Sequence, residues 1–466
     1  MHGKTARLFA AVVAVVVFAL FLRWYYLATA IVSDPVRGDA VQYYNYAWNL
    51  LNRHIFSMAP PGTEVVTPDS YRDPGYPLLM AAWMITDDLD RWYAGVLLTQ
   101  AVLGALVAGM TVLLARLWLP LGWSVVAGIL IAIWPHNITI SEYLLSESLY
   151  GFLAMLALLA YAWALTRHGL VVAAFAGICF GLAILVNPVL LPVPALLFLV
   201  AYWRGDTPKR LLLTFALCAA VLPVAWNVRN ALLPSTTKSS GDRALQNLVQ
   251  GSWPSYHSAW RESVGYEPHL PQDLPLADRE TRKAAGLEKL TLIRQEERAM
   301  MQSPAEGMAL LVTRFSGAPI YYALWYLLEK PALLWGWNIQ IGQEFYINPT
   351  RYSPLETVPA LRALVSLCRG LNPVIGIGAL LVGILAILRG RRTTNALAMV
   401  GLGNNVLNAV AWLLVFVTLL HMVLQAEPRY SIPYRPFEIV LGVTALAWLC
   451  NSLVERRKAA APIGGQ

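Results

Sequence analysis

Apolar residues in this chain come in long blocks separated by shorter polar segments. Representative blocks run from Leu8 to Leu22, from Trp92 to Ala115 and from Ala396 to Leu424. Each is close to the roughly 20 apolar residues that a helix needs to cross the hydrocarbon core of a bilayer. Because no water satisfies backbone polar groups there, such blocks form helices. The pattern predicts an all-α polytopic membrane protein with about 10–12 transmembrane helices.

The first apolar block is preceded by Lys4 and Arg7, as in a secretory signal peptide. It is followed by Arg23 and the aromatic run from Trp24 to Tyr26 rather than by a small-residue cleavage site. These features are typical of a retained signal anchor with aromatic residues at the membrane surface. We therefore expect this block to be the first transmembrane helix.

Composition supports this class of protein. Of the 466 residues, 57% are hydrophobic and 13% are charged, which is unlike a soluble domain. The net charge of +8 does not indicate nucleic-acid binding, because the basic residues cluster at the ends of apolar blocks and no nucleic-acid motif accompanies them. The four cysteines show neither a pairing pattern nor metal-ligand spacing, and no Walker motif or serine-triad motif is present. We expect neither a nucleic-acid partner nor ATP chemistry.

The basic residues at block ends predict the orientation. If the helices alternate from a cytoplasmic N-terminus to a cytoplasmic C-terminus, all of these basic residues fall on the cytoplasmic side of the membrane. They are Lys4, Arg7, Arg116, Arg167, Arg204, Lys209, Arg210, Arg389, Arg391, Arg392, Arg456, Arg457 and Lys458. We expect a single domain over residues 1–466. The opposite side of the membrane then receives a first outer loop (31–90), the turn around Asn137, a large polar loop (232–306) and residues 427–436. These segments hold most of the acidic and aromatic polar residues, so we expect any chemistry there. The pattern leaves open whether residues 305–345 cross the membrane.

Asp39 is the first candidate site residue, in the first outer loop just beyond the first apolar block. If this segment is helical, Asp39, Tyr43 and Tyr46 share a face, which places a carboxylate above an aromatic wall suited to a sugar. We expect Asp39 to act as a base or a binding residue. The alternative is that it is a helix N-cap or a surface acid.

A second candidate group in the same loop is the segment from Tyr71 to Pro77, whose two prolines restrict the backbone. Arg72, beside Tyr71, has the planar fork that binds phosphate through paired hydrogen bonds. The alternative is that Arg72 only anchors a helix at the membrane surface.

Two carboxylates, Glu142 and Glu147, lie between two apolar blocks near the same surface. Glu147 begins the second of these blocks and is the stronger candidate. The alternative for Glu147 is a stabilising acid at a helix N-terminus.

Two further segments supply basic side chains. Arg229 and Asn230 lead to Lys238, which is followed by hydroxyl residues and a glycine, a set of donors that suits a phosphate. Near the C-terminus, Arg429 and Tyr430 lie at the outer surface, with an ion pair between Glu427 and Arg429 as the alternative account.

In this order, the landmarks resemble the C-type glycosyltransferases, and within them the bacterial branch of protein mannosyltransferases and lipid A aminoarabinose transferases. The landmarks are Asp39 with its tyrosines, Tyr71 to Pro77, Ser146-Glu147, Trp226 to Asn230, and Arg429-Tyr430 with Pro433. The resemblance spans nearly the whole chain. It implies transmembrane helices with juxtamembrane helices in the first outer loop, in a bacterial inner membrane with the site facing the periplasm.

The resemblance also implies an activity: inverting transfer of a hexosyl or pentosyl group from a polyprenyl-phosphate donor to a hydroxyl of a glycolipid, glycan or protein. Asp39 falls where such enzymes keep their catalytic base, and Glu147 where a second acid often lies. The cations available to meet the leaving phosphate are Arg72, Arg229, Lys238 and Arg429. No cofactor is expected to be required, although two acids leave room for a divalent cation.

One position departs from this family: Asn187 stands before Pro188, where relatives often carry arginine or lysine. A transporter or flippase of a lipid-linked sugar is the alternative function, since it would also have many helices and outer arginines. Transporters often show paired halves with interrupted helices, and no internal repeat is visible in this sequence. The sequence does not identify the sugar, the acceptor or the oligomeric state.

Overall fold

The computed structural model describes residues 2–85, 88–205, 207–234, 237–266, 274–389 and 405–460. Some positions used above lie outside this description. They are residues 235–236 and 267–273 of the large polar loop, Arg391 and Arg392, the first residues of the block from Ala396, and the side chains of Arg389, Arg457 and Lys458.

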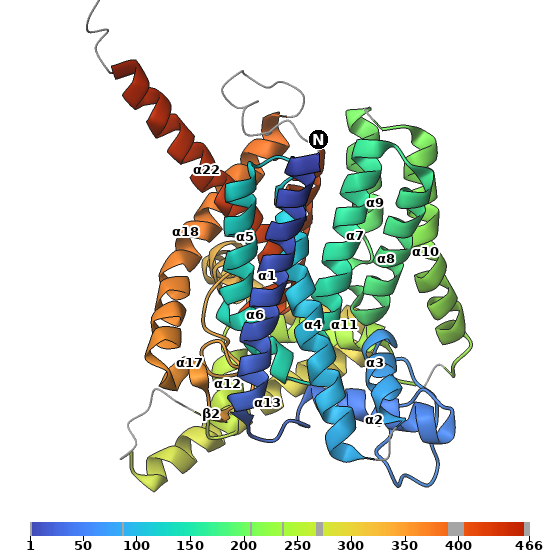
Figure 1. Cartoon of the computed structure of the whole chain (residues 1–466). Helices are drawn as coiled ribbons and strands as arrows, with labels where there is room; N and C mark the ends of the chain where they lie inside the picture. Colours follow the sequence, from blue (N-terminus) through green and yellow to red (C-terminus); the bar gives the residue numbers. More distant parts are fainter. Residues whose placement is uncertain are drawn as a thin grey trace, which may run out of the picture.

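Long helices run side by side through the described chain and form its main body (Figure 1). They are α1 (His2–Thr29), α4 (Leu89–Ala115), α5 (Leu121–Ile133), α7 (Glu147–Arg167), α8 (Leu170–Val186), α9 (Val193–Arg204), α10 (Lys209–Ala231), α18 (Pro359–Arg389), α20 (Asn405–Val423) and α22 (Arg435–Ala460). The predicted all-α architecture is confirmed, and the first apolar block is α1, which packs against α4 and α5.

Shorter elements connect these helices, and several gather at the end of the body opposite the N-terminus (Figure 1). They are β1 (Ile31–Val32), α2 (Asp39–Arg53), α3 (Gly75–Met84), α6 (Pro135–Thr139), η1 (Ile140–Glu142), η2 (Pro188–Leu190), α11 (Ser240–Gly251), α12 (Tyr256–Ser263), α13 (Leu276–Gln302), α14 (Pro304–Gly317), α15 (Pro319–Leu324), η3 (Trp325–Glu329), α16 (Lys330–Leu334), β2 (Thr350–Tyr352), α17 (Pro354–Thr357), α21 (Pro428–Ser431) and η4 (Ile432–Tyr434). Strands β1 and β2 pair antiparallel and join the end of α1 to the segment before α17.

Seven helices in the described residues are long and apolar enough to cross a membrane. The bent pair of α5 with α6 and η1 raises this number to eight if it counts as one span. Two shorter apolar helices are Leu170–Val186 and Pro188–Arg204. If the bent pair and both shorter helices cross the membrane, the described chain has ten spans, the lower end of the predicted range. The segment from Pro304 to Leu334, whose crossing the sequence left open, is broken into short helices and is not among these spans.

A proline explains the bend between α5 and α6, and a buried arginine stabilises it. Trp134 precedes Pro135 and takes an extended backbone (ψ 118°), as a residue before proline prefers. Pro135 lacks the N–H that the carbonyl of Ile131 would accept in a continuous helix. Arg23 donates instead to the carbonyls of Ile131 and Ala132, at 3.4 and 3.3 Å. Arg23 is therefore buried against α5.

The large polar loop has a small hydrophobic core of its own. Its buried residues come from α11 to α14 and are Val249, Ala259, Leu290, Ile293, Met300 and Leu311. Helix α13 (Leu276–Gln302) is the longest described helix of this loop. This packing holds α11 and α12 in fixed positions beside the ends of the membrane helices.

Candidate active site

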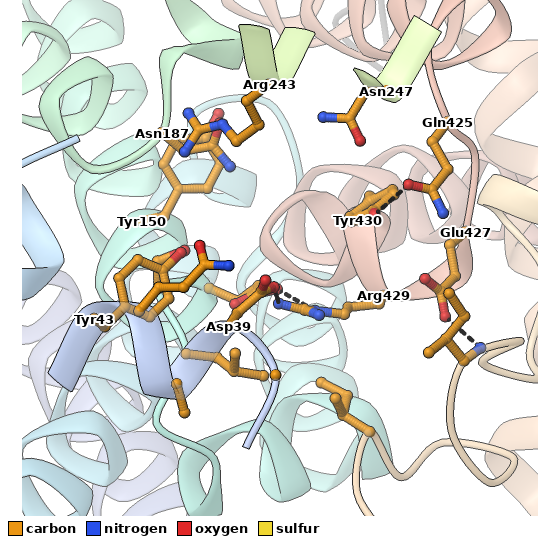
Figure 2. Close-up of a pocket in the computed structure, with 18 of the residues that line it drawn as sticks. Asp39, Tyr43, Tyr150, Asn187, Arg243, Asn247, Gln425, Glu427, Arg429 and Tyr430 are labelled. Carbon is orange, nitrogen blue, oxygen red and sulfur yellow. Dashed lines mark hydrogen bonds and ion pairs between the residues drawn. The ribbon is translucent and has the colours of Figure 1, made fainter. Parts of the chain in front are cut away.

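A cavity of about 540 Å³ lies among the elements at the end of the molecule where α2 and α11 are found (Figures 1 and 2). Its walls come from segments far apart in the sequence: the start of α2, Tyr71 and Arg72, the start of α7, the faces of α11 and α12, and residues between His421 and Tyr434. A volume of this size suits a ligand of a few hundred daltons.

Asp39 is the first residue of α2 and lines this cavity. Its carboxylate accepts from Arg72 Nη2 at 2.5 Å through Oδ1 and from Arg429 Nη2 at 2.9 Å through Oδ2. Burial would raise the Asp39 pKa, but the two guanidinium groups outweigh burial and hold that pKa well below its usual range. Asp39 is thus an ionised carboxylate shared by two cations, and the helix-capping alternative does not describe its contacts.

Arg72 links the later part of the first outer loop to α2, which lies in the same loop. Besides pairing with Asp39, it donates from Nε to Gln42 Oε1 at 2.6 Å, and its guanidinium lies 5.1 Å from the centre of the Tyr43 ring. Only 12% of its side chain is exposed, so it does not reach out to a membrane surface. Tyr71 lines the same cavity and donates to Gln246 on α11 at 2.8 Å.

Arg429, from the short helix α21, bridges two acids. Its Nε donates to Glu147 Oε1 at 2.6 Å, while Nη2 donates to Asp39. Glu147 is the first residue of α7, where the helix dipole also favours an acid. Within the described chain no ion pair links Arg429 to Glu427; Glu427 accepts the backbone N–H of Ile341 at 2.9 Å. Burial raises the pKa of Glu427 to about 7.

Three residues predicted for the site do not line the cavity: Arg229, Asn230 and Lys238. Arg229 donates to the carbonyl of Asp69 at 2.8 Å, lies 4.9 Å from the Trp226 ring centre, and donates to Asn230. The Lys238 side chain is exposed. Arg229 and Asn230 brace the first outer loop, because the end of α10 faces that loop and not the cavity.

The predicted aromatic wall is only partly present. Tyr43 lines the cavity and donates to Ser146 Oγ at 3.3 Å. Tyr46 is fully buried behind it, stacked 4.3 Å from Phe56 and hydrogen-bonded to Asp69. Tyr430 lines the cavity and donates to Gln425 Oε1 at 3.0 Å.

Sequence reasoning missed several lining residues. They are Gln42 and, as Figure 2 shows, Arg243, Asn247, Gln425 and Glu427. A signal existed for those on α11, because Ser239 and Asp242 form a capping box that starts this helix. Arg243 follows directly and pairs with Asp73 at 2.6 Å. Gln42 is one helical turn after Asp39, a spacing that places the two side chains together.

The Asn187 departure has a local role in the structure. Its side chain accepts from the backbone N–H of Val189 at 3.2 Å and starts η2, and the residue lines the cavity. It supplies no cation. The arginines beside Asp39 therefore come from elsewhere, namely from the first outer loop and from α21.

The hydrogen-bond donors that line the cavity suit an anion. Two guanidinium groups with aligned N–H donors bind a phosphate well. No group of three or more histidine, cysteine, aspartate or glutamate side chains that could hold a metal occurs in the part of the chain that the structure describes. Asp39 and Glu147, the acids considered for a divalent cation, are both hydrogen-bonded to Arg429.

No protein-family model and no curated protein matches this chain. Among solved structures it is similar to the archaeal oligosaccharyltransferase AglB from Archaeoglobus fulgidus in complex with an inhibitory peptide and a dolichol-phosphate, with a TM-score of 0.51 and 15% identity over 99% of this chain and 52% of that chain. It also matches ArnT from Cupriavidus metallidurans bound to undecaprenyl phosphate, with a TM-score of 0.35 and 15% identity over 97% of this chain and 79% of that chain.

The chain spans about half the length of the AglB chain that it matches. At this level of identity the AglB match shows the fold alone. The chain has the fold of the C-type glycosyltransferases, a polytopic helical membrane fold, as its sequence landmarks predicted.

Proposed function

We propose that the chain is an inverting glycosyltransferase that moves a sugar from a polyprenyl-phosphate donor to a hydroxyl acceptor on the non-cytoplasmic side of the membrane. The observation that carries this proposal is the Asp39 carboxylate held between Arg72 and Arg429 in a cavity at the ends of membrane helices. A base and phosphate-binding cations at one point are what this transfer needs. The dolichol-phosphate in the AglB complex is a lipid phosphate of the same chemical class.

In the proposed reaction, Asp39 takes the proton of the acceptor hydroxyl as that oxygen bonds to the anomeric carbon. The bond from that carbon to the phosphate oxygen breaks, and its electron pair leaves with the polyprenyl phosphate. Arg72 and Arg429 stabilise the charge on the departing phosphate. Attack opposite the leaving group inverts the anomeric configuration.

The shared arginines imply an order of binding. While both arginines donate to Asp39, its lowered pKa makes it a weak base. A donor phosphate offers the guanidinium groups other acceptors, and each hydrogen bond moved from Asp39 to phosphate raises the carboxylate pKa. The donor is therefore expected to bind before the acceptor is deprotonated.

We further propose a periplasmic site in a bacterial inner membrane with cytoplasmic termini. The clustering of basic residues at the predicted cytoplasmic ends supports this orientation. No cofactor is assigned to the reaction, because the arginines meet the phosphate charge. The transfer assay is also run with an added divalent cation to test whether the reaction depends on it.

The purified chain in nanodiscs is tested with labelled polyprenyl-phosphate sugars and candidate acceptors, with and without divalent cations. We expect glycosylated acceptor and free polyprenyl phosphate in equal amounts, with inverted anomeric configuration. In proteoliposomes, movement of intact donor across the bilayer without acceptor modification would instead establish the alternative, a flippase of a lipid-linked sugar.

A further inference from the structure

One wall of the cavity differs in character from the cluster of Asp39, Arg72 and Arg429. It consists of uncharged amides and aromatic rings: Asn247 and Gln250 on α11, Tyr256 and Trp260 on α12, and Gln425 before α21. Figure 2 shows Asn247 and Gln425 across the cavity from Tyr43 and Tyr150, with Asp39 and Arg429 nearer its centre. We call these five residues the amide wall.

A buried carboxylate fixes the orientation of this wall. Glu297, on α13, is only 6% exposed and accepts from Gln250 Nε2 at 2.9 Å and from Gln246 Nε2 at 3.3 Å. Because its two carboxyl oxygens accept these bonds, Glu297 holds both amide nitrogens toward α13. Gln246 Oε1 is taken by the Tyr71 hydroxyl. Within the described residues, Gln250 Oε1 and both polar side-chain atoms of Asn247 have no protein partner.

Such groups match the chemistry of a neutral sugar. Amide oxygens and nitrogens accept from and donate to hydroxyl groups. Tyr256 and Trp260 are one helical turn apart on one face of α12, and their half-buried rings offer flat apolar surface to ring carbons. An anionic sugar would face Glu427, whereas a cationic one would meet Arg429 and Arg243. Arg243 and Arg429 are already paired with acids, so an anionic sugar finds no open cation. Glu427 has no ion pair in the described chain, but its carboxylate already accepts the backbone N–H of Ile341.

We propose that Asn247 and Gln250 of the amide wall bind the hydroxyl groups of a neutral sugar carried by the donor, beside the rings of Tyr256 and Trp260, and that Glu297 positions Gln250 for this contact. This inference rests on the proposed function, since it assigns the sugar to the part of the cavity beside the phosphate-binding arginines. It narrows the substrate class to donors with an uncharged, hydroxyl-bearing sugar.

The test compares binding of a short-chain polyprenyl-phosphate hexose with binding of the same polyprenyl phosphate without sugar, to the full chain in nanodiscs. We expect the wild type to bind the sugar-bearing lipid more tightly. Asn247→Ala is expected to weaken that binding about five- to tenfold per lost hydrogen bond, and to leave the affinity for the sugar-free lipid unchanged. Asn52→Ala, at an exposed position of α2, is the matched control and should change neither affinity.

A second variant, Glu297→Gln, tests the positioning role. It is expected to reduce the preference for the sugar-bearing lipid without changing the affinity for the sugar-free one, which a loss of folding would lower as well. Equal wild-type affinities for the two lipids, equal losses for both in Asn247→Ala, or preference for a uronic-acid or amino-sugar donor would overturn the amide-wall proposal and leave the transferase standing. Failure of the wild type to bind either lipid would instead overturn the proposed function.

Discussion

Arg429 is the residue on which the charge balance of the cavity depends. It hydrogen-bonds to Asp39 and Glu147, while Arg72 hydrogen-bonds to Asp39. The formal charges of the two arginines and the two carboxylates cancel, so an arriving phosphate makes the cluster net negative, and it must take N–H donors of Arg72 and Arg429 from the carboxylates to be bound. In the proposed reaction, donor binding and the activation of Asp39 as a base are therefore coupled through the side chains of Arg72 and Arg429.

Arg429→Gln is expected to affect folding and transfer separately. It leaves the Glu147 carboxylate, only 9% exposed, without its cation, which should lower the free energy of unfolding by about 2–5 kcal/mol. Transfer should fall at least about a hundredfold through loss of phosphate stabilisation. Thermal unfolding and turnover of the single variant and of Arg429→Gln/Glu147→Gln check this. The double variant should regain stability but not transfer, and regained transfer would count against the phosphate role.

Glu427 should make stability depend on pH. Burial raises its folded-state pKa to about 7 from the ordinary value of 4.5. A carboxyl whose pKa is raised in the folded state stabilises the fold below its unfolded pKa, and this contribution is lost as pH rises through the folded pKa. We expect the melting temperature to fall between about pH 4.5 and 7, and Glu427→Gln to flatten that decline. An unchanged slope in the variant would show that other groups cause it.

At the scale of elements, local chemistry made some features predictable. Pro135 and Pro188 stop α5 and α8, which end at Ile133 and Val186, with the residue before each proline as the C-cap. Other features depend on packing between distant segments. The hydrogen bond from Arg429 to Asp39 joins residues 390 positions apart, and Arg229 carries the expected charge on the expected side but faces the first outer loop. No local pattern distinguishes these two arginines.

The bend at Pro135 also predicts the effect of losing Arg23. Arg23→Met would leave the carbonyls of Ile131 and Ala132 without the donors that replace the broken helix bonds. Stability should fall by about 1–3 kcal/mol, the cost of buried unsatisfied acceptors. Thermal unfolding in detergent measures this, with Arg7→Met at an exposed position of α1 as control. Equal melting temperatures for the two variants would refute the account of the bend.

At the scale of the whole molecule, the cavity and the N-terminus lie at opposite ends of the helical body. The N-terminus lies at one end of the body, and α2 and α11 lie at the other (Figure 1). The sequence predicted this separation from basic residues and polar loops. It could not predict the cavity itself, which needs α2, α7, α11, α12 and α21 packed together.

The proposed orientation predicts which positions react from outside the cell. In a cysteine-free background, Asp34→Cys should react with an impermeant maleimide in spheroplasts, because Asp34 lies in the first outer loop. Gly3→Cys should react only after the membrane is opened. Labelling in the reverse pattern would place the cavity on the cytoplasmic side.

The central claim is that this cavity transfers sugar with Asp39 as base, and turnover of Asp39→Asn tests it most directly. The control is Asp34→Asn, the same change at an exposed position outside the cavity. We predict that Asp39→Asn folds and binds donor but loses about 10²–10⁴-fold in transfer rate, while Asp34→Asn keeps the wild-type rate. A folded Asp39→Asn protein that transfers sugar at the wild-type rate would contradict the account.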